Sequence, residues 1–96
     1  MQKRSLTRDD VPFLRDEIML WHQAFGFKPE RAWIVSWAQY FPHDYIRKAI
    51  AITKKWASKT PNITRPEAEL YRFTNGTLSH MADAAKVADE LLGVEL

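Results

Sequence analysis

The sequence predicts an all-α fold: a compact bundle of four to five helices with a long or bent C-terminal helix, in a single domain over residues 1–96. Apolar residues recur at steps of three and four along most of the chain, which is the period of a helix packed on one side. No run of useful length alternates apolar and polar residues as a half-buried strand does. With 46% hydrophobic content, 96 residues suffice for one core.

Prolines mark the predicted helix starts, because the fixed φ of proline suits the first turn, where an N–H has no helical partner. The four that stand in such places are Pro12, Pro29, Pro42 and Pro66. The first helix is expected from Asp10 or Pro12 to Ala24, with Gly26 ending it. Its apolar contacts are assigned to Phe13, Ile18, Leu20, Trp21 and Phe25.

The second helix is expected from Pro29 to about Tyr40, and the third from Pro42 to near Ser58. In the second, Trp33, Ile34, Trp37 and Phe41 keep steps of three or four. Core packing is favoured over base stacking for Trp33 and Trp37, because two large aromatic residues four apart share one helical face.

The last segment allows two structures. The apolar series Leu70, Thr74, Thr77, Met81, Ala84, Ala88 and Leu91 keeps alternating steps of four and three. This continuity favours one long helix, with a possible bend at Gly76. Asn75-Gly76 is nevertheless a strong turn signal, so the alternative is two shorter helices, with Thr77 capping the second. Thr64 and Glu67 have the spacing of a capping box at the start of the segment.

The third helix is predicted to have one apolar and one basic face. Ile46, Ala49, Ile50, Thr53 and Ala57 form the apolar series. Charge is also uneven along the chain: residues 28–65 hold eight Lys or Arg and two acidic residues, whereas residues 66–96 hold two basic and six acidic residues. A basic surface beside aromatic side chains is typical of nucleic-acid binding. The candidate binding residues are Lys28, Arg31, Arg47, Lys48, Lys54, Lys55, Trp56, Lys59 and Arg65.

No pattern indicates an enzyme, a metal site or a cofactor. His22, His43 and His80 are scattered, and their expected role is that of ordinary surface or half-buried histidines. The acidic pairs Asp9-Asp10 and Asp16-Glu17 are explained by the positive end of the first helix dipole. Cysteine is absent, and neither a signal peptide nor a membrane span is recognisable, which predicts a cytoplasmic protein without a membrane partner.

Residues 24–81 resemble the C-terminal domain of DnaD-type primosomal proteins and phage replisome organisers. The matching residues are Ala24-Phe25-Gly26, Pro29-Glu30, Ile34, Trp37, Asp44, Ile46, Ala49-Ile50, Thr53, Phe73 and Leu78. Thr77 replaces a usual aliphatic residue, and Met81 a usual Trp. The resemblance implies DNA binding by Phe73 and the residues after it, and contacts with replication proteins. The acidic balance after residue 66 disfavours a DNA-binding tail here, so the basic helix is the preferred surface.

Two functions therefore compete. The first is a small nucleic-acid-binding or replication-accessory module of phage or plasmid type, which binds single- or double-stranded DNA. A helix-turn-helix made by the second and third helices is a weaker variant, because few base-reading residues begin the third helix. The second is a protein-interaction module, an inhibitor or adaptor from a mobile element, whose basic face binds an acidic protein or a second copy, so that the chain is a monomer or a homodimer. Membership of a larger RNA-guided or replication complex fits the same features.

Overall fold

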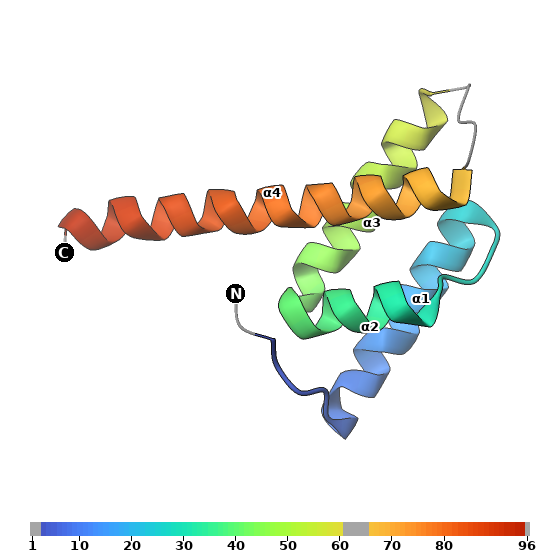
Figure 1. Cartoon of the computed structure of the whole chain (residues 1–96), viewed down its shortest axis with the longest axis horizontal. Helices are drawn as coiled ribbons and strands as arrows, with labels where there is room; N and C mark the ends of the chain where they lie inside the picture. The colour runs from blue at the N-terminus through green and yellow to red at the C-terminus, as the bar shows by residue number, and fades with distance from the viewer. Residues whose placement is uncertain (1–2, 61–65, 96) are drawn as a thin grey trace.

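The chain folds into an all-α bundle, as predicted (Figure 1). The computed structural model describes residues 3–60 and 66–95. A short 3₁₀ helix, Arg8–Asp10, leads directly into α1 (Val11–Phe25). It is followed by α2 (Arg31–Tyr40), α3 (His43–Ser58) and α4 (Pro66–Glu95). None of the described helices combines the length and the apolar character that crossing a lipid bilayer requires.

The predicted start and stop signals agree with the helix ends. Each of the four prolines lies within two residues of a helix start; Pro42 immediately precedes α3, and Pro66 is the first residue of α4. Gly26 ends α1 in the left-handed conformation, with φ of 81°, and its N–H donates to the carbonyl of His22 at 2.8 Å. Thr64 of the predicted capping box lies outside the described residues.

The last helix is continuous, so the alternative of two shorter helices is wrong. Asn75 and Gly76 lie within α4, which Figure 1 shows as one uninterrupted rod. The side chain of Asn75 has a tertiary role: its Oδ1 accepts a hydrogen bond from Nε1 of the buried Trp37 at 3.1 Å. Packing on both sides of this turn signal therefore outweighs the local preference of Asn-Gly.

The buried face of α3 packs mainly against α4 and α1. Ile46, Ala49, Ile50 and Thr53 are buried, which confirms the apolar face predicted for this helix. Thr53 also forms a polar contact within the core, because its hydroxyl lies 2.8 Å from that of Thr74 on α4. The contacts on this face fix the rotation of α3 about its own axis.

A stack of aromatic rings joins α4 to the first two helices. The ring of Tyr71 is nearly parallel to Trp21 on one side and to Trp33 on the other, at centroid distances of 4.9 and 5.4 Å. The Tyr71 hydroxyl accepts a hydrogen bond from the backbone N–H of Glu30 at 2.7 Å. Trp37 is buried and Trp33 packs half-buried against the same cluster, so their predicted core role is confirmed.

The expected core face of α1 is partly wrong. Trp21 is buried and Phe25 packs against the core, but Phe13, Ile18 and Leu20 are exposed. The face of α1 that meets the bundle instead carries Leu14, Glu17, Trp21 and Ala24. Glu17 was not predicted on this face, because its carboxylate was assigned to the helix dipole, and a carboxylate is an unfavourable core residue unless it has a partner.

We predict that removing the Tyr71 hydroxyl destabilises the bundle less than removing the ring. Tyr71→Phe deprives the Glu30 N–H of its acceptor and should lower the free energy of unfolding by about 1–2 kcal/mol. Tyr71→Ala also empties the space between Trp21 and Trp33 and should cost about 3–5 kcal/mol. Urea denaturation followed by tryptophan fluorescence measures both, and equal losses would contradict a structural role for the ring stack.

A second prediction concerns the middle of α4. A Cβ added at Gly76 meets no atom within 4 Å, so Gly76→Ala should raise the free energy of unfolding by about 1 kcal/mol. Asn75→Ala, the neighbouring control, should lower it by about 1–2 kcal/mol because the buried Trp37 Nε1 loses its acceptor. Thermal unfolding followed by circular dichroism separates the two. A less stable Gly76→Ala variant would argue against a continuous helix.

Candidate nucleic-acid interface

The outward side of α3 carries the cations predicted from the sequence. Lys48, Lys54, Lys55 and Lys59 are exposed and Arg47 is half-buried; we call these five residues the basic face. At about 100° of rotation per residue, Arg47 and Lys54 lie on the edge toward α1, whereas Lys48, Lys55 and Lys59 point outward between α1 and α4. The predicted separation of an apolar and a basic face on this helix is confirmed.

Among residues 3–60 and 66–95, no acidic side chain lies within ion-pair distance of the basic face, although the charge of Arg47 opposes the burial that raises the pKa of Glu17. The ion pairs found there all belong to a separate cluster around His43. Glu67 lines the same hollow as Lys54, beside Phe25 and Phe27, but the two charges are not within ion-pair distance. The positive charge of this surface is therefore available to a partner.

Two neighbouring hollows on α1 connect Lys28 to the basic face. One is lined by Lys28, Ile18 and His22, and the other by Arg47, Asp16 and Leu20. Both include Met19 and Gln23, so Lys28 and Arg47 lie on opposite sides of a ridge formed by these two residues. Met19 is 58% exposed, which places an apolar group between the two cations.

The structure does not bring all the predicted site residues together. Arg31 is exposed at the start of α2, and no described contact joins it to the basic face. Arg65 lies outside the described residues. Trp56 is half-buried, and its ring is stacked on Phe73 of α4 at a centroid distance of 4.2 Å. One face of the indole is therefore occupied within the protein.

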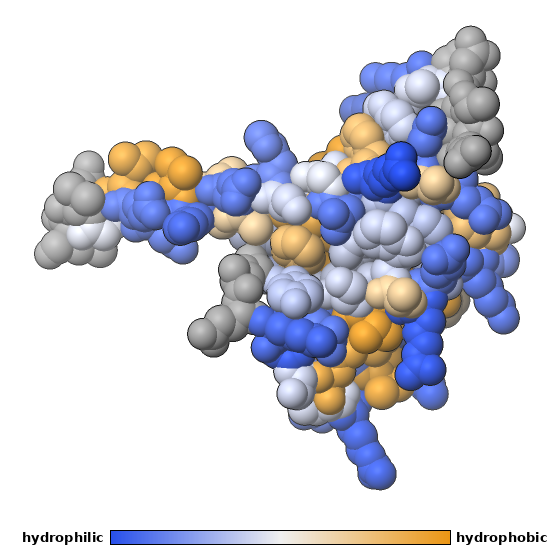
Figure 2. Space-filling view, in the orientation of Figure 1, coloured by the Kyte–Doolittle hydropathy of each residue, from blue (hydrophilic) through white to orange (hydrophobic). Residues whose placement is uncertain are grey.

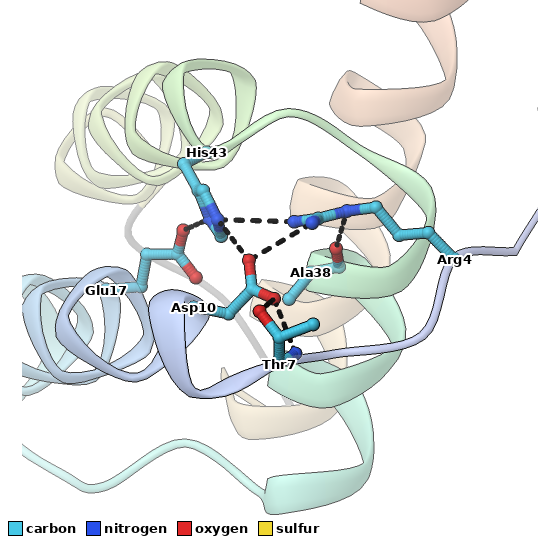
Figure 3. A network of polar contacts seen from close by, with 6 residues as sticks. All are labelled: Arg4, Thr7, Asp10, Glu17, Ala38 and His43. Atoms are coloured by element: carbon cyan, nitrogen blue, oxygen red, sulfur yellow. Dashed lines mark hydrogen bonds and ion pairs between the residues drawn. The ribbon is translucent and has the colours of Figure 1, made fainter.

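The start of α3 is held by a cluster of ion pairs that the sequence did not predict (Figure 3). His43 Nδ1 lies 2.8 Å from Glu17 Oε1, and His43 Nε2 lies 3.1 Å from Asp10 Oδ1. Arg4 Nη1 is also 3.1 Å from Asp10 Oδ1, and Arg4 Nε donates to the carbonyl of Ala38 at 3.1 Å. The cluster therefore joins the N-terminal segment to the first three α-helices.

The two carboxylates of this cluster are perturbed in opposite directions. A hydrogen bond from the Thr7 backbone N–H, supported by His43 and Arg4, lowers the pKa of Asp10 from 3.8 to about 2. Burial raises the pKa of Glu17, and its contact with His43 opposes this shift. Among the described residues, Glu17 Oε2 has no hydrogen-bond partner. His43 Nδ1–H can donate to Glu17, which offsets part of the cost of burying that carboxylate, whereas His43 Nε2 lies 3.1 Å from Asp10 Oδ1 and 3.2 Å from Arg4 Nη2.

This cluster also positions Arg47. The ring of Phe13 stacks on His43 at a centroid distance of 4.2 Å, and the Arg47 guanidinium carbon lies 5.7 Å from the centre of the same ring. The geometry is that of a cation–π contact. Phe13, expected in the core, instead supports the one arginine of the basic face.

These contacts give Asp10, Glu17 and the half-buried His43 specific partners that were not predicted from the sequence. Asp10 and Glu17 bind His43 rather than merely lying near a helix dipole, and His43 is an internal ion-pair partner. The available signal was the spacing of Leu14, Glu17 and Trp21, which places Glu17 on the core face of α1 and requires a buried partner. Within the described ranges, no three His, Cys, Asp or Glu side chains are arranged to hold a metal ion.

Comparisons of this chain with protein-family models, with curated proteins and with solved structures give no match. The similarity to DnaD-type domains stays a prediction. Functional inference consequently depends on the charges and contacts of the chain itself.

We predict that the ion pairs around Asp10 make the folded chain less stable as the pH is lowered toward 2. Because the pKa of Asp10 is lower in the folded chain, its carboxylate stabilises the fold above about pH 4, and this contribution is lost as the pH falls through about 2. Asp10→Asn should therefore lower the melting temperature near neutral pH, with a difference from wild type that shrinks toward pH 2. Asp9→Asn, an exposed neighbour, is the control. A difference that is independent of pH would contradict this assignment.

Proposed function

We propose that this chain binds nucleic acid, with the basic face of α3 contacting phosphate groups. The observation that supports this most strongly is that its cations are unpaired within the described residues while the opposite side of α3 is buried. Lys28 extends the positive surface across the Met19 and Gln23 ridge. Clustered Lys and Arg bind nucleic acids by displacing counterions from the phosphates, without needing a particular base sequence.

Stabilisation of the helix itself explains only part of this charge. Lys55 lies in the last turn of α3 and Lys59 directly follows the helix, where cations interact favourably with the negative end of the dipole. Arg47 and Lys48 lie in the first half of the helix, where a cation gains nothing from the dipole. Arg47 has internal contacts with Phe13 and an attraction to Glu17, so Lys48 is the cation whose position favours an external anionic partner.

The geometry favours phosphate contacts over base reading. In a helix-turn-helix, the first turns of the second helix reach the base edges. Here the first turn of α3 holds His43, which is ion-paired internally, and Asp44, which is exposed and would repel phosphate. Trp56 has one ring face covered by Phe73. Binding with little sequence preference is therefore the expected mode.

The similarity to DnaD-type domains suggests a setting for this activity. We propose a replication-accessory role in a phage or plasmid, with DNA as the partner. In that family the last helix and its tail bind DNA. Residues 83–95 of this chain hold four acidic residues and one lysine, so the proposal assigns the contact to α3 instead.

A protein-interaction module is the second candidate. Met19 supports it, because an exposed apolar side chain flanked by Lys28 and Arg47 has the composition of a protein interface with an acidic partner. Met19→Ala separates the two functions. It removes an apolar anchor for a protein while leaving every cation that a phosphate would contact.

We predict that a labelled oligonucleotide binds this chain in a salt-dependent manner. Fluorescence anisotropy with single- and double-stranded DNA, at several salt concentrations, should show a Kd that rises steeply with salt. The double change Lys48→Glu and Lys55→Glu should weaken binding about tenfold or more and reduce the slope of log K against log salt by about two for duplex DNA.

The control is Lys86→Glu, which makes one of the two charge reversals of the α3 variant at an exposed position on α4. The affinity of Lys86→Glu for DNA should stay within about threefold of wild type, because a charge change far from the contact acts only through the net charge of the chain. Absence of binding at low salt, or equal loss in the control and the α3 variant, would argue against the basic face. If Met19→Ala binds DNA as wild type does, the result supports phosphate contacts by the cations over a protein interface anchored by Met19.

A further inference from the structure

The distal part of α4 extends beyond the rest of the bundle (Figure 1). Met81, Ala82 and Ala85 are its last half-buried residues, and every side chain described from Lys86 to Gly93 is exposed. Three of them are large and apolar: Val87, Leu91 and Leu92 are 55%, 66% and 60% exposed. Figure 2 shows a hydrophobic patch over this end of the helix. Such a patch is costly in water and typically marks a contact surface.

The exposed apolar residues continue a stripe that starts inside the bundle. Ala84, Ala88 and Leu91 prolong the line of Thr77 and Met81 at alternating steps of three and four, which is the spacing of helices that pair along their length. Lys86, Asp89 and Glu90 lie on other sides of the helix. A helical stretch without tertiary contacts is only marginally stable in water, so a partner along this stripe would also stabilise the helix.

A hollow at the base of the stripe provides a complementary surface. Ile52 of α3 lines it together with Phe73, Thr77 and Met81 of α4. Arg72 and His80 also line this hollow, and Arg72 has no acidic partner among the described residues. Apolar residues of the stripe therefore lead directly from this hollow to the exposed end of the helix.

We propose that the distal half of α4 pairs with the same helix of a second copy in an antiparallel homodimer. In this arrangement Leu91 of each copy enters the hollow of the other, beside Phe73 and Ile52. Glu90, which directly precedes Leu91 and lies about 100° from it around the helix, approaches Arg72 of the second copy. One contact thus occurs twice around a two-fold axis, as in most homodimers. Small side chains near the axis, Ala84 and Ala85, let the two helices come close.

Charge along α4 distinguishes this arrangement from a parallel one. Parallel pairing would place the acidic ends of the two helices side by side, where like charges repel. Antiparallel pairing places each acidic end near Arg72 and His80 of the other chain. No lysine of α3 is among the residues that line the hollow. The dimer therefore does not depend on nucleic-acid binding.

Sedimentation velocity over a range of concentrations tests self-association. Wild type should convert from monomer to dimer as concentration rises, whereas Leu91→Glu should be a monomer under the same conditions. Lys86→Glu lies on another side of the same helical stretch, so its dimer dissociation constant should stay within about threefold of the wild-type value. Equal tryptophan fluorescence and an equal urea midpoint of the core confirm that each variant is folded, since all four tryptophans lie outside the distal part of α4. A wild type that stays monomeric at high concentration would overturn the proposal.

Orientation is tested by single cysteines, which are unambiguous because the chain has none of its own. Ala84→Cys lies close to the proposed axis and should be joined to its copy by a short bis-maleimide. In Leu91→Cys the two thiols would be roughly 20 Å apart along the helices, at 1.5 Å per residue, and should not be joined. Cross-linking of both variants would indicate parallel helices and overturn the antiparallel arrangement, as would cross-linking of Leu91→Cys alone.

Discussion

The packing of α3 between α1 and α4 is the constraint on which the remaining features depend. Ile46, Ala49, Ile50 and Thr53 are buried on one side of this helix, so its rotation cannot change without exposing them. Fully burying one such aliphatic side chain contributes about 1.5–3 kcal/mol. The lysines of α3 must consequently face outward, and the positive surface follows from the way the core is filled.

The cluster of Arg4, Asp10, Glu17 and His43 also fixes the start of α3 relative to α1. A buried ion pair is a weak source of stability because desolvation offsets most of its Coulomb attraction. Its geometry is nevertheless selective: only one turn of α1 places Glu17 opposite the first residue of α3. The cluster also supports Phe13 beneath His43, and Phe13 in turn lies beside Arg47. Phe13 thus connects the internal ion pairs to Arg47 on the basic face.

Sequence reasoning was most successful where a repeating pattern extends over many residues. The two faces of α3 and the continuous apolar series of α4 were recognisable because each is repeated over several turns, so one unfavourable residue such as Gly76 does not hide it. It failed for contacts between distant segments. Nothing local pairs His43 with Asp10 or Glu17, and the acceptor role of Asn75 depends on an indole 38 residues earlier. Phe13 was misassigned because an aromatic side chain suits either a core or the support of a cation.

The proposed DNA-binding surface lies on α3, whereas the exposed apolar surface lies on the second half of α4. Because the two surfaces belong to different helices, a map of amide chemical-shift changes by NMR tells them apart as a DNA oligonucleotide is added at low and at high salt. We predict salt-sensitive changes in α3 from Arg47 to Lys59 and in α1 around Met19 and Gln23, with little change in α2. Changes confined to α4, or none at low salt, would contradict nucleic-acid binding by the basic face.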